Sequence, residues 1–120
     1  MNILNIGQDF SKDPAGRFRA DGEGNNGEEF REDHLKPRID SLAEDEKLII
    51  IIDDGIEGYG SSFLVEGFAG LVKFGYITAE DLLGKIEIRY ENEEFEFYEN
   101  KIIEYIKQAK FNSKHYSSGS

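Results

Sequence analysis

The sequence predicts a single-domain α/β fold in which a mixed β-sheet of four to five strands is flanked by helices. The chain has 120 residues, a usual length for one domain. Segments with the apolar spacing of strands alternate with segments that have the spacing of helices, an order typical of α/β proteins. The aliphatic run Leu48–Ile52 lacks polar alternation, so it predicts a central strand buried on both faces.

The first half of the chain predicts a strand, a long polar loop and a helix. The apolar residues of Asn2–Gly7 indicate the strand, and a short strand near Arg17–Ala20 is expected to form a hairpin with it. The helix is expected to begin after Asn26, because Glu29 three residues later completes a capping-box pattern. Pro37 lacks an amide hydrogen, so we expect a kink or a break at this residue.

The second half of the chain supplies the remaining elements. After the central strand we expect a helix from Ser62 to about Phe74, a short helix capped by Thr78, a strand over 85–90, a strand over 94–98 that pairs back to it, and an amphipathic helix over 99–110. Residues 1–112 are therefore assigned to the domain, and residues 113–120 are predicted to be a disordered tail.

Composition excludes several classes of function. The formal net charge is −11, and this field repels phosphate backbones, so no nucleic-acid partner is expected. Cysteine is absent and the two histidines, His34 and His115, are far apart, so we expect no disulfide, metal or other cofactor. The sequence shows no signal peptide and no apolar run that could span a bilayer, which predicts a cytoplasmic protein without membrane contact.

The segment Gly55–Val72 combines five glycines with two adjacent serines at the start of an apolar helix. Ser61 or Ser62 is predicted to cap that helix, and the alternative is a loop that binds or accepts a phosphate. We consider a phosphate-binding loop because open α/β sheets bind ligands where a buried strand leads into a helix. Gly67 and Gly70 predict a close approach to their helix face. We expect a helix of this chain there, and the alternative is a partner protein.

The same segment does not match the common catalytic or nucleotide-binding motifs. The glycines lack the spacing of a dinucleotide fingerprint, and no lysine follows them as in a phosphate-binding loop. Neither histidine is placed to serve as a base for a nucleophilic serine. The sequence therefore predicts a protein that is not an enzyme, with no catalytic residue.

Three arginines near the polar loop form a second candidate site. Arg17, Arg19 and Arg31 could line an anion-binding cleft in an otherwise acidic chain. The alternative is that they form ordinary salt bridges with the surrounding carboxylates.

Four segments together resemble a known family: "DFSKDPAGRF", "DGEGNNGEEFREDHLKP", "IIDDGIEGYGSSFLVEGFAGLV" and "IIEYIKQA". They are similar to the STAS-like bacterial domains of unknown function, which belong to the STAS superfamily of anti-sigma-factor antagonists and often stand beside histidine-kinase-like ATPases. In the antagonists, such an ATPase phosphorylates a serine at the helix start, and the phosphate abolishes partner binding. The resemblance implies Ser62 for this role, or Ser61 if the loop is shifted by one residue.

These observations leave three hypotheses. The first is a regulatory protein–protein interaction module, whose expected partner-binding residues are Gly58, Tyr59, Gly60, Ser61, Ser62 and Glu66. The alternative is a domain that binds a small anionic ligand or a nucleotide through the arginines and the helix N-termini. A weaker alternative is an acidic stand-alone inhibitor that occupies the nucleic-acid site of a basic partner.

Overall fold

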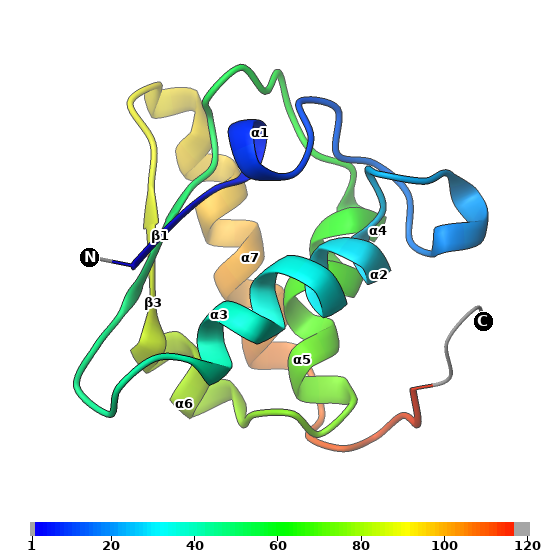
Figure 1. Cartoon of the computed structure of the whole chain (residues 1–120), viewed down its shortest axis with the longest axis vertical. Helices are drawn as coiled ribbons and strands as arrows, with labels where there is room; N and C mark the ends of the chain where they lie inside the picture. Colours follow the sequence, from blue (N-terminus) through cyan, green and yellow to red (C-terminus); the bar gives the residue numbers. More distant parts are fainter. Residues whose placement is uncertain (1, 117–120) are drawn as a thin grey trace.

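The computed structural model describes residues 2–116, and it shows an α/β protein with a three-stranded parallel sheet (Figure 1). The strands are β1 (Asn2–Asn5), β2 (Leu48–Ile51) and β3 (Ile86–Arg89), in the spatial order β1-β2-β3. Leu4 lies beside Ile50, and Ile50 lies beside Ile88, so the strands are in register along their whole length.

The helices connect the strands and follow β3. They are α1 (Ile6–Asp9), the 3₁₀ turn η1 (Arg19–Asp21), α2 (Gly27–Glu29), the π-helix η2 (Phe30–Leu35), α3 (Lys36–Asp40), α4 (Ser61–Leu64), the π-helix η3 (Val65–Ala69), α5 (Gly70–Lys73), α6 (Ala79–Lys85), the 3₁₀ turn η4 (Glu93–Phe95) and α7 (Glu96–Gln108). Thus α2, η2 and α3 form one continuous helical segment, and α4, η3 and α5 form another. None of the helices in residues 2–116 is long and apolar enough to cross a membrane.

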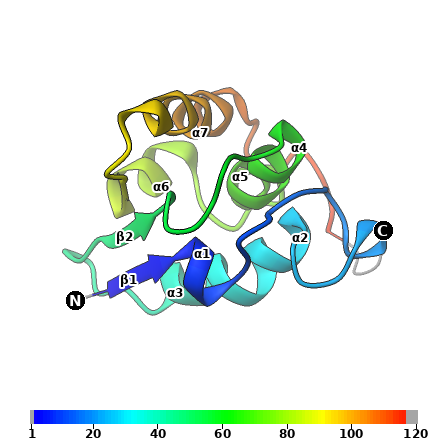
Figure 2. The same ribbon diagram turned by 90° about the horizontal axis from the view of Figure 1, so that it is seen from above.

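The sheet forms one side of the molecule, and the helices pack against its other side (Figures 1 and 2). Leu4, Leu48 and Ile50 point from the sheet into this core, each at most 1% exposed. They meet buried side chains of the helices, among them Phe63 and Ile102. One hydrophobic core between sheet and helices therefore positions the loops at both ends of the strands.

The expected mixed sheet of four to five strands is not found in the described residues. The segment Arg17–Ala20 does not form a strand, because the Asp21 carboxylate accepts the backbone amides of Arg17 and Phe18 and folds the chain into a 3₁₀ turn. Residues 94–98 do not pair with β3 either. The Asn92 side chain accepts from the Glu94 amide and starts η4, which leads directly into α7.

The prediction that β2 is buried on both faces is wrong. Leu48, Ile50 and Ile52 are buried, but Ile49 and Ile51 between them are only half-buried. The sequence does not show this alternation of burial, because both faces of the strand carry aliphatic side chains.

The expected helix caps at Asn26 and Thr78 are confirmed. The Asn26 side chain accepts from the Glu29 amide at 2.7 Å, and the Thr78 hydroxyl accepts from the Asp81 amide at 3.2 Å. Pro37 does not break its helix. It lies in the first turn of α3, directly after the π-helix Phe30–Leu35, where the changed hydrogen-bond pattern accommodates its missing donor.

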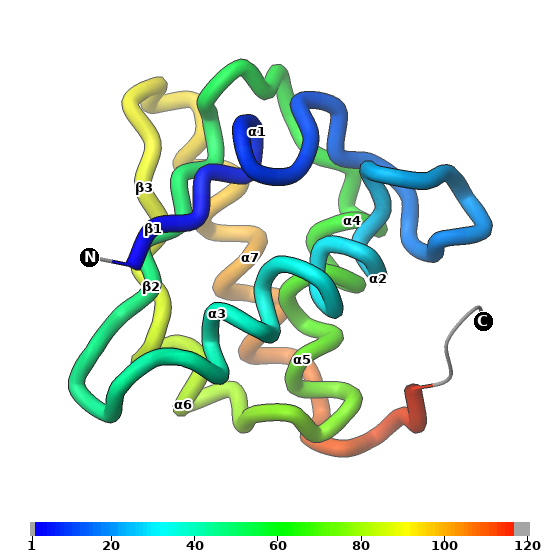
Figure 3. Tube along the Cα trace, in the orientation of Figure 1, coloured from blue at the N-terminus to red at the C-terminus, as the bar shows by residue number. Residues whose placement is uncertain are grey.

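The first residues of the predicted tail lie along the domain, as the chain trace shows (Figure 3). The Lys114 amide of the tail donates to the Lys73 carbonyl at 2.9 Å, and the Asn112 amide just before the tail donates to the Val72 carbonyl at 2.9 Å. The Tyr116 hydroxyl lies 2.7 Å from the Glu28 carboxylate. Residues 117–120 of the predicted tail lie outside the described residues.

Candidate functional site

The start of α4 is capped by backbone and not by a serine. Gly60 occupies the N-cap position, and its carbonyl accepts from the Phe63 amide at 3.1 Å and from the Leu64 amide at 3.2 Å. No side chain caps this helix, so the expectation of a serine cap is wrong. Ser61 and Ser62 instead occupy the first two helical positions, one residue too late to cap the helix.

The two serines differ in their surroundings. Ser61 is exposed, whereas Ser62 is half-buried and its hydroxyl accepts a hydrogen bond of 3.4 Å from Nη2 of Arg17. The Arg17 side chain is 43% exposed, and its Nε lies 4.0 Å from Oε1 of Glu66. A guanidinium with access to solvent therefore bridges Ser62 and Glu66.

Glu66 joins this exposed arginine to a buried one. Arg31 is fully buried, and its Nη1 donates to the Glu66 carboxylate at 2.7 Å and to the Glu66 carbonyl at 2.9 Å. Its Nε donates to Glu32 at 2.8 Å, and its guanidinium lies over the ring of Phe74 at 4.5 Å. Such a charge is stable inside a protein only when it is paired, so Glu66 holds Arg31 in place.

The glycines of the second helical segment allow the two segments to approach each other. A Cβ at Gly67 would lie 3.0 Å from the Phe30 ring, and one at Gly70 would lie 2.8 Å from Nη1 of Arg31. A Cβ at Gly27 would lie 2.8 Å from the Cβ of Glu66. The prediction that Gly67 and Gly70 serve packing within the chain is confirmed.

The three candidate anion-binding arginines do not converge on one open cleft. Arg19 makes a two-pronged contact with Asp33, with both bonds at 3.1 Å, and Nε of Arg19 lies 3.7 Å from Glu28. The Asp33 hydrogen bonds raise the pKa of Arg19. Arg19 and Arg31 thus take part in ion pairs, as the salt-bridge alternative describes. An anion-binding role for Arg17, Arg19 and Arg31 stays a prediction.

The loop before α4 borders a shallow hollow of about 510 Å³. Its lining combines Gly58, Tyr59 and Gly60 with the 12–15 segment and with Tyr98 of α7. The Tyr59 hydroxyl donates to the Ile52 carbonyl at 2.6 Å, and burial raises the pKa of this side chain. Tyr59 therefore fixes the loop onto the end of β2, close to the two serines.

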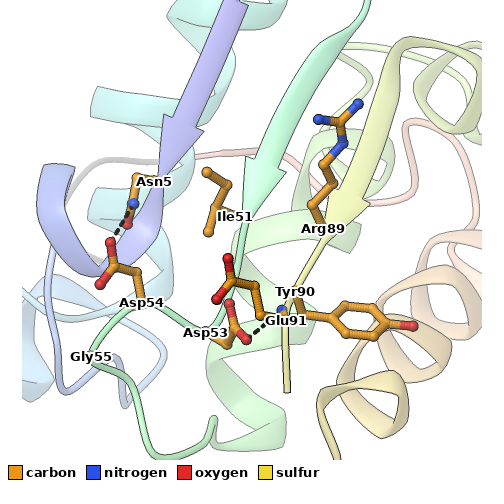
Figure 4. A pocket seen from close by; sticks show the side chains of 8 residues that line it. All are labelled: Asn5, Ile51, Asp53, Asp54, Gly55, Arg89, Tyr90 and Glu91. Carbon is orange, nitrogen blue, oxygen red and sulfur yellow. Dashed lines mark hydrogen bonds between the residues drawn. The ribbon is translucent and has the colours of Figure 1, made fainter. Parts of the chain in front are cut away.

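A second hollow, of about 460 Å³, lies at the carboxyl ends of the three strands (Figure 4). Its lining residues are Asn5, Ile51, Asp53, Asp54, Gly55, Arg89, Tyr90 and Glu91. The Asp53 carboxylate accepts from the Glu91 amide at 2.7 Å. Hydrogen bonds from Asn5 and Gln8 lower the pKa of Asp54. Hydrogen bonds thus fix the positions of both acidic side chains.

Sequence reasoning missed this second hollow. No role was predicted for Asp53 and Asp54, although both directly follow the predicted strand Leu48–Ile52, and ligands of open α/β sheets bind at the carboxyl ends of the strands. Within residues 2–116, no group of three or more His, Asp or Glu side chains could hold a metal ion.

Comparisons with protein-family models, with curated proteins and with solved structures each found no match.

Proposed function

We propose that this chain is a non-enzymatic regulatory module that binds a protein partner through the loop and helix start Gly58–Glu66, and that phosphorylation of Ser62 switches the binding. The observation that carries the proposal is the position of the two serines. Because Gly60 caps the helix, neither hydroxyl is needed to hold the helix start. A phosphate can therefore be added there without removing a cap.

Arg17 favours Ser62 over Ser61 as the modified residue. Its Nη2 already lies 3.4 Å from the Ser62 hydroxyl, within reach of a phosphate attached to that oxygen. A phosphoserine carries about −1.5 to −2 charges at neutral pH, more than the single charge of the Glu66 carboxylate. Arg17 would then turn from Glu66 to the phosphate, which would move the polar loop next to the docking surface.

The resemblance to STAS-like domains supports the class of partner. It points to a histidine-kinase-like ATPase that transfers the γ-phosphoryl group of ATP to the serine oxygen and releases ADP, while the hydroxyl proton passes to a base of the kinase. The acidic chain suits a basic docking surface on that partner. Glu66 is 8% exposed, so it would act through Arg17 rather than through direct contact.

The test combines mass measurement with binding. The protein is isolated from its native cells with its partner, and the peptide that contains Ser61 and Ser62 is analysed for an added phosphate. We expect Ser62→Ala to bind the partner like the wild type. We expect Ser62→Asp to bind at least about tenfold more weakly, because its carboxylate draws Arg17 away from Glu66 and moves the polar loop beside the docking surface. Ser61→Asp is the matched control for charge. Wild-type affinity of Ser62→Asp would refute the switch.

A further inference from the structure

The outer face of the sheet carries apolar side chains that no helix covers. Ile3 is 45% exposed, and Ile49 and Ile51 beside it are half-buried. In the described part of the chain, none of the three belongs to the hydrophobic core or to the side chains packed against it. Parallel sheets are almost always covered on both faces, so this face lacks a covering layer.

Charged residues on this face follow an ordered pattern. Along β2, the outward positions read Lys47, Ile49, Ile51 and Asp53, with the two charged residues just outside the strand but in phase with it. The outward positions of β3 are Glu87 and Arg89. β2 and β3 therefore each carry opposite charges on either side of the strand centre. Reversing the direction of the strand exchanges them.

We propose that a second copy of this chain covers the face in an antiparallel, two-fold symmetric dimer. A half-turn about an axis parallel to the sheet and perpendicular to the strands, at the level of Ile50, places each charged outward residue of β2 and β3 opposite one of the opposite sign, while Ile3 of β1 faces Asn5. Lys47 then faces Asp53 of the second copy, Ile49 faces Ile51, and Glu87 faces Arg89. Two-fold symmetry forms each of these pairs twice. Sheets that pack in this way lie about 10 Å apart with closely aligned strands.

The hollow at the carboxyl ends of the strands fits this arrangement. Asn5, Ile51 and Arg89 of its lining are the last outward residues of the three strands, so the hollow opens on the same face (Figure 4). Asp53 is held in it by the amides of Glu91 and Asn92, at 2.7 and 2.8 Å. Lys47 of the second copy would enter the hollow and meet this fixed carboxylate.

A basic partner protein is the competing occupant, because the chain carries a net charge of −11. The face itself is not uniformly acidic, however. A basic surface laid on it would meet Lys47 and Arg89 as well as the acids, whereas a second copy matches every charge. The three strands alone cover on the order of 200 Å² per copy, against about 800 Å² in a standard interface. We therefore expect a dimer that dissociates on dilution.

Charge reversal on β3 tests the dimer. Glu87 and Arg89 form an ion pair within the chain, their side chains are 44% and 56% exposed, and neither belongs to the hydrophobic core. Sedimentation equilibrium is measured from about 10 μM to about 1 mM protein, which covers weak association. We expect Glu87→Arg and Arg89→Glu each to weaken the wild-type dimer by about tenfold or more, since each places like charges opposite each other twice. An equal mixture of the two variants should restore association, because every facing pair is again complementary.

Two further variants serve as controls. The double variant Glu87→Arg/Arg89→Glu should form dimers like the wild type, since it exchanges both charges. Lys107→Glu changes the net charge by as much as Arg89→Glu, but Lys107 is an exposed residue of α7, away from the sheet. This variant should leave the dissociation constant of the dimer unchanged. Thermal unfolding of each variant confirms that it is folded.

Three results would overturn the proposal. The first is a wild-type chain that stays monomeric at about 1 mM. The second is a dimer that both single variants preserve, and the third is a mixture of the single variants that fails to associate. If the first result is accompanied by a shift of the Ile49 and Ile51 NMR signals on addition of a lysine-rich amphipathic peptide, this face is assigned to a basic partner.

Discussion

The helical segment Ser61–Lys73 is held differently in its middle and in its first turn. Its middle is locked in place: Glu66 pairs with the buried Arg31, and Gly67 lies against the Phe30 ring. Its first turn is open, because Ser61 is exposed and Ser62 makes one hydrogen bond, of 3.4 Å, to a solvent-accessible arginine.

We expect this difference to separate stability from partner binding within thirteen consecutive residues. The middle of the segment holds the two helical segments together, so substitutions there should unfold the protein. The first turn holds little, so substitutions there should alter binding and leave folding intact. Glu66 connects the two regions, since it contacts both Arg31 and Arg17.

The largest effect is expected in the middle of the segment. Arg31→Met removes the buried cation. The Glu66 carboxylate, in a residue that is 8% exposed, then has Arg17 as its remaining ion-pair partner, with Nε of Arg17 4.0 Å from Oε1 of Glu66. Breaking a buried ion pair in this way costs about 3–5 kcal/mol of unfolding free energy. Urea denaturation measures the loss. The double variant Arg31→Met/Glu66→Gln should recover much of it, and a loss below about 1 kcal/mol would show that the pair does not hold the helices.

Gly27→Ala should have the next largest effect. The added Cβ would lie 2.8 Å from the Glu66 Cβ and 2.9 Å from the Phe63 carbonyl oxygen, and backbone cannot move aside cheaply. We expect a loss of about 2 kcal/mol from overpacking. Gly84→Ala in α6 is the matched control. A Cβ there meets nothing within 4 Å, so this variant should gain roughly 0.5–1 kcal/mol. Equal effects of the two substitutions would contradict the close approach.

A smaller effect is expected from His34, which lies in η2 with its ring against Phe10. Burial lowers the pKa of His34 below its ordinary value of 6.5, with a further contribution from Arg38. The unfolded chain therefore binds the proton more tightly, and stability should fall as the pH drops below about 6.5. His34→Gln should flatten this part of the stability–pH curve. An unchanged slope would mean that His34 does not cause it.

The smallest effect is expected at the open end. Ser62→Ala should change the unfolding free energy by less than about 0.5 kcal/mol, because Gly60 caps the helix. Thr78→Ala removes a side-chain cap from α6 and should cost about 1 kcal/mol, which makes it the matched control. A similar loss for both variants in thermal unfolding would mean that Ser62 has a structural role.

What the sequence could predict depended on distance along the chain. The caps at Asn26 and Thr78 were predictable, because each capping side chain and the amide that donates to it lie three residues apart. The pairing of Arg31 with Glu66 was not, since these residues are 35 positions apart and nothing local marks them as partners. The serine cap was predicted wrongly because a glycine one position earlier competes for the same role, and only the backbone geometry decides between them.

The extent of the sheet was also beyond local reasoning. The parallel order of β1, β2 and β3 depends on how the helices cross between the strands. The segments 17–20 and 94–98 have strand-like patterns, but the first contributes to the 3₁₀ turn η1 and the second to η4 and α7. The glycines at positions 67 and 70 did predict a close approach, but not that Arg31 would be the residue in contact with Gly70.

The most direct test of the proposed switch is a ³¹P NMR titration of the chain phosphorylated at Ser62. An ordinary phosphoserine has a second pKa of about 6. If Arg17 binds the phosphate, the dianion is favoured. We therefore expect the second pKa of the phosphate to be at least about half a unit lower in this chain than in the same chain with Arg17→Gln. An identical phosphate pKa in both proteins would contradict the role of Arg17 and, with it, the basis for choosing Ser62.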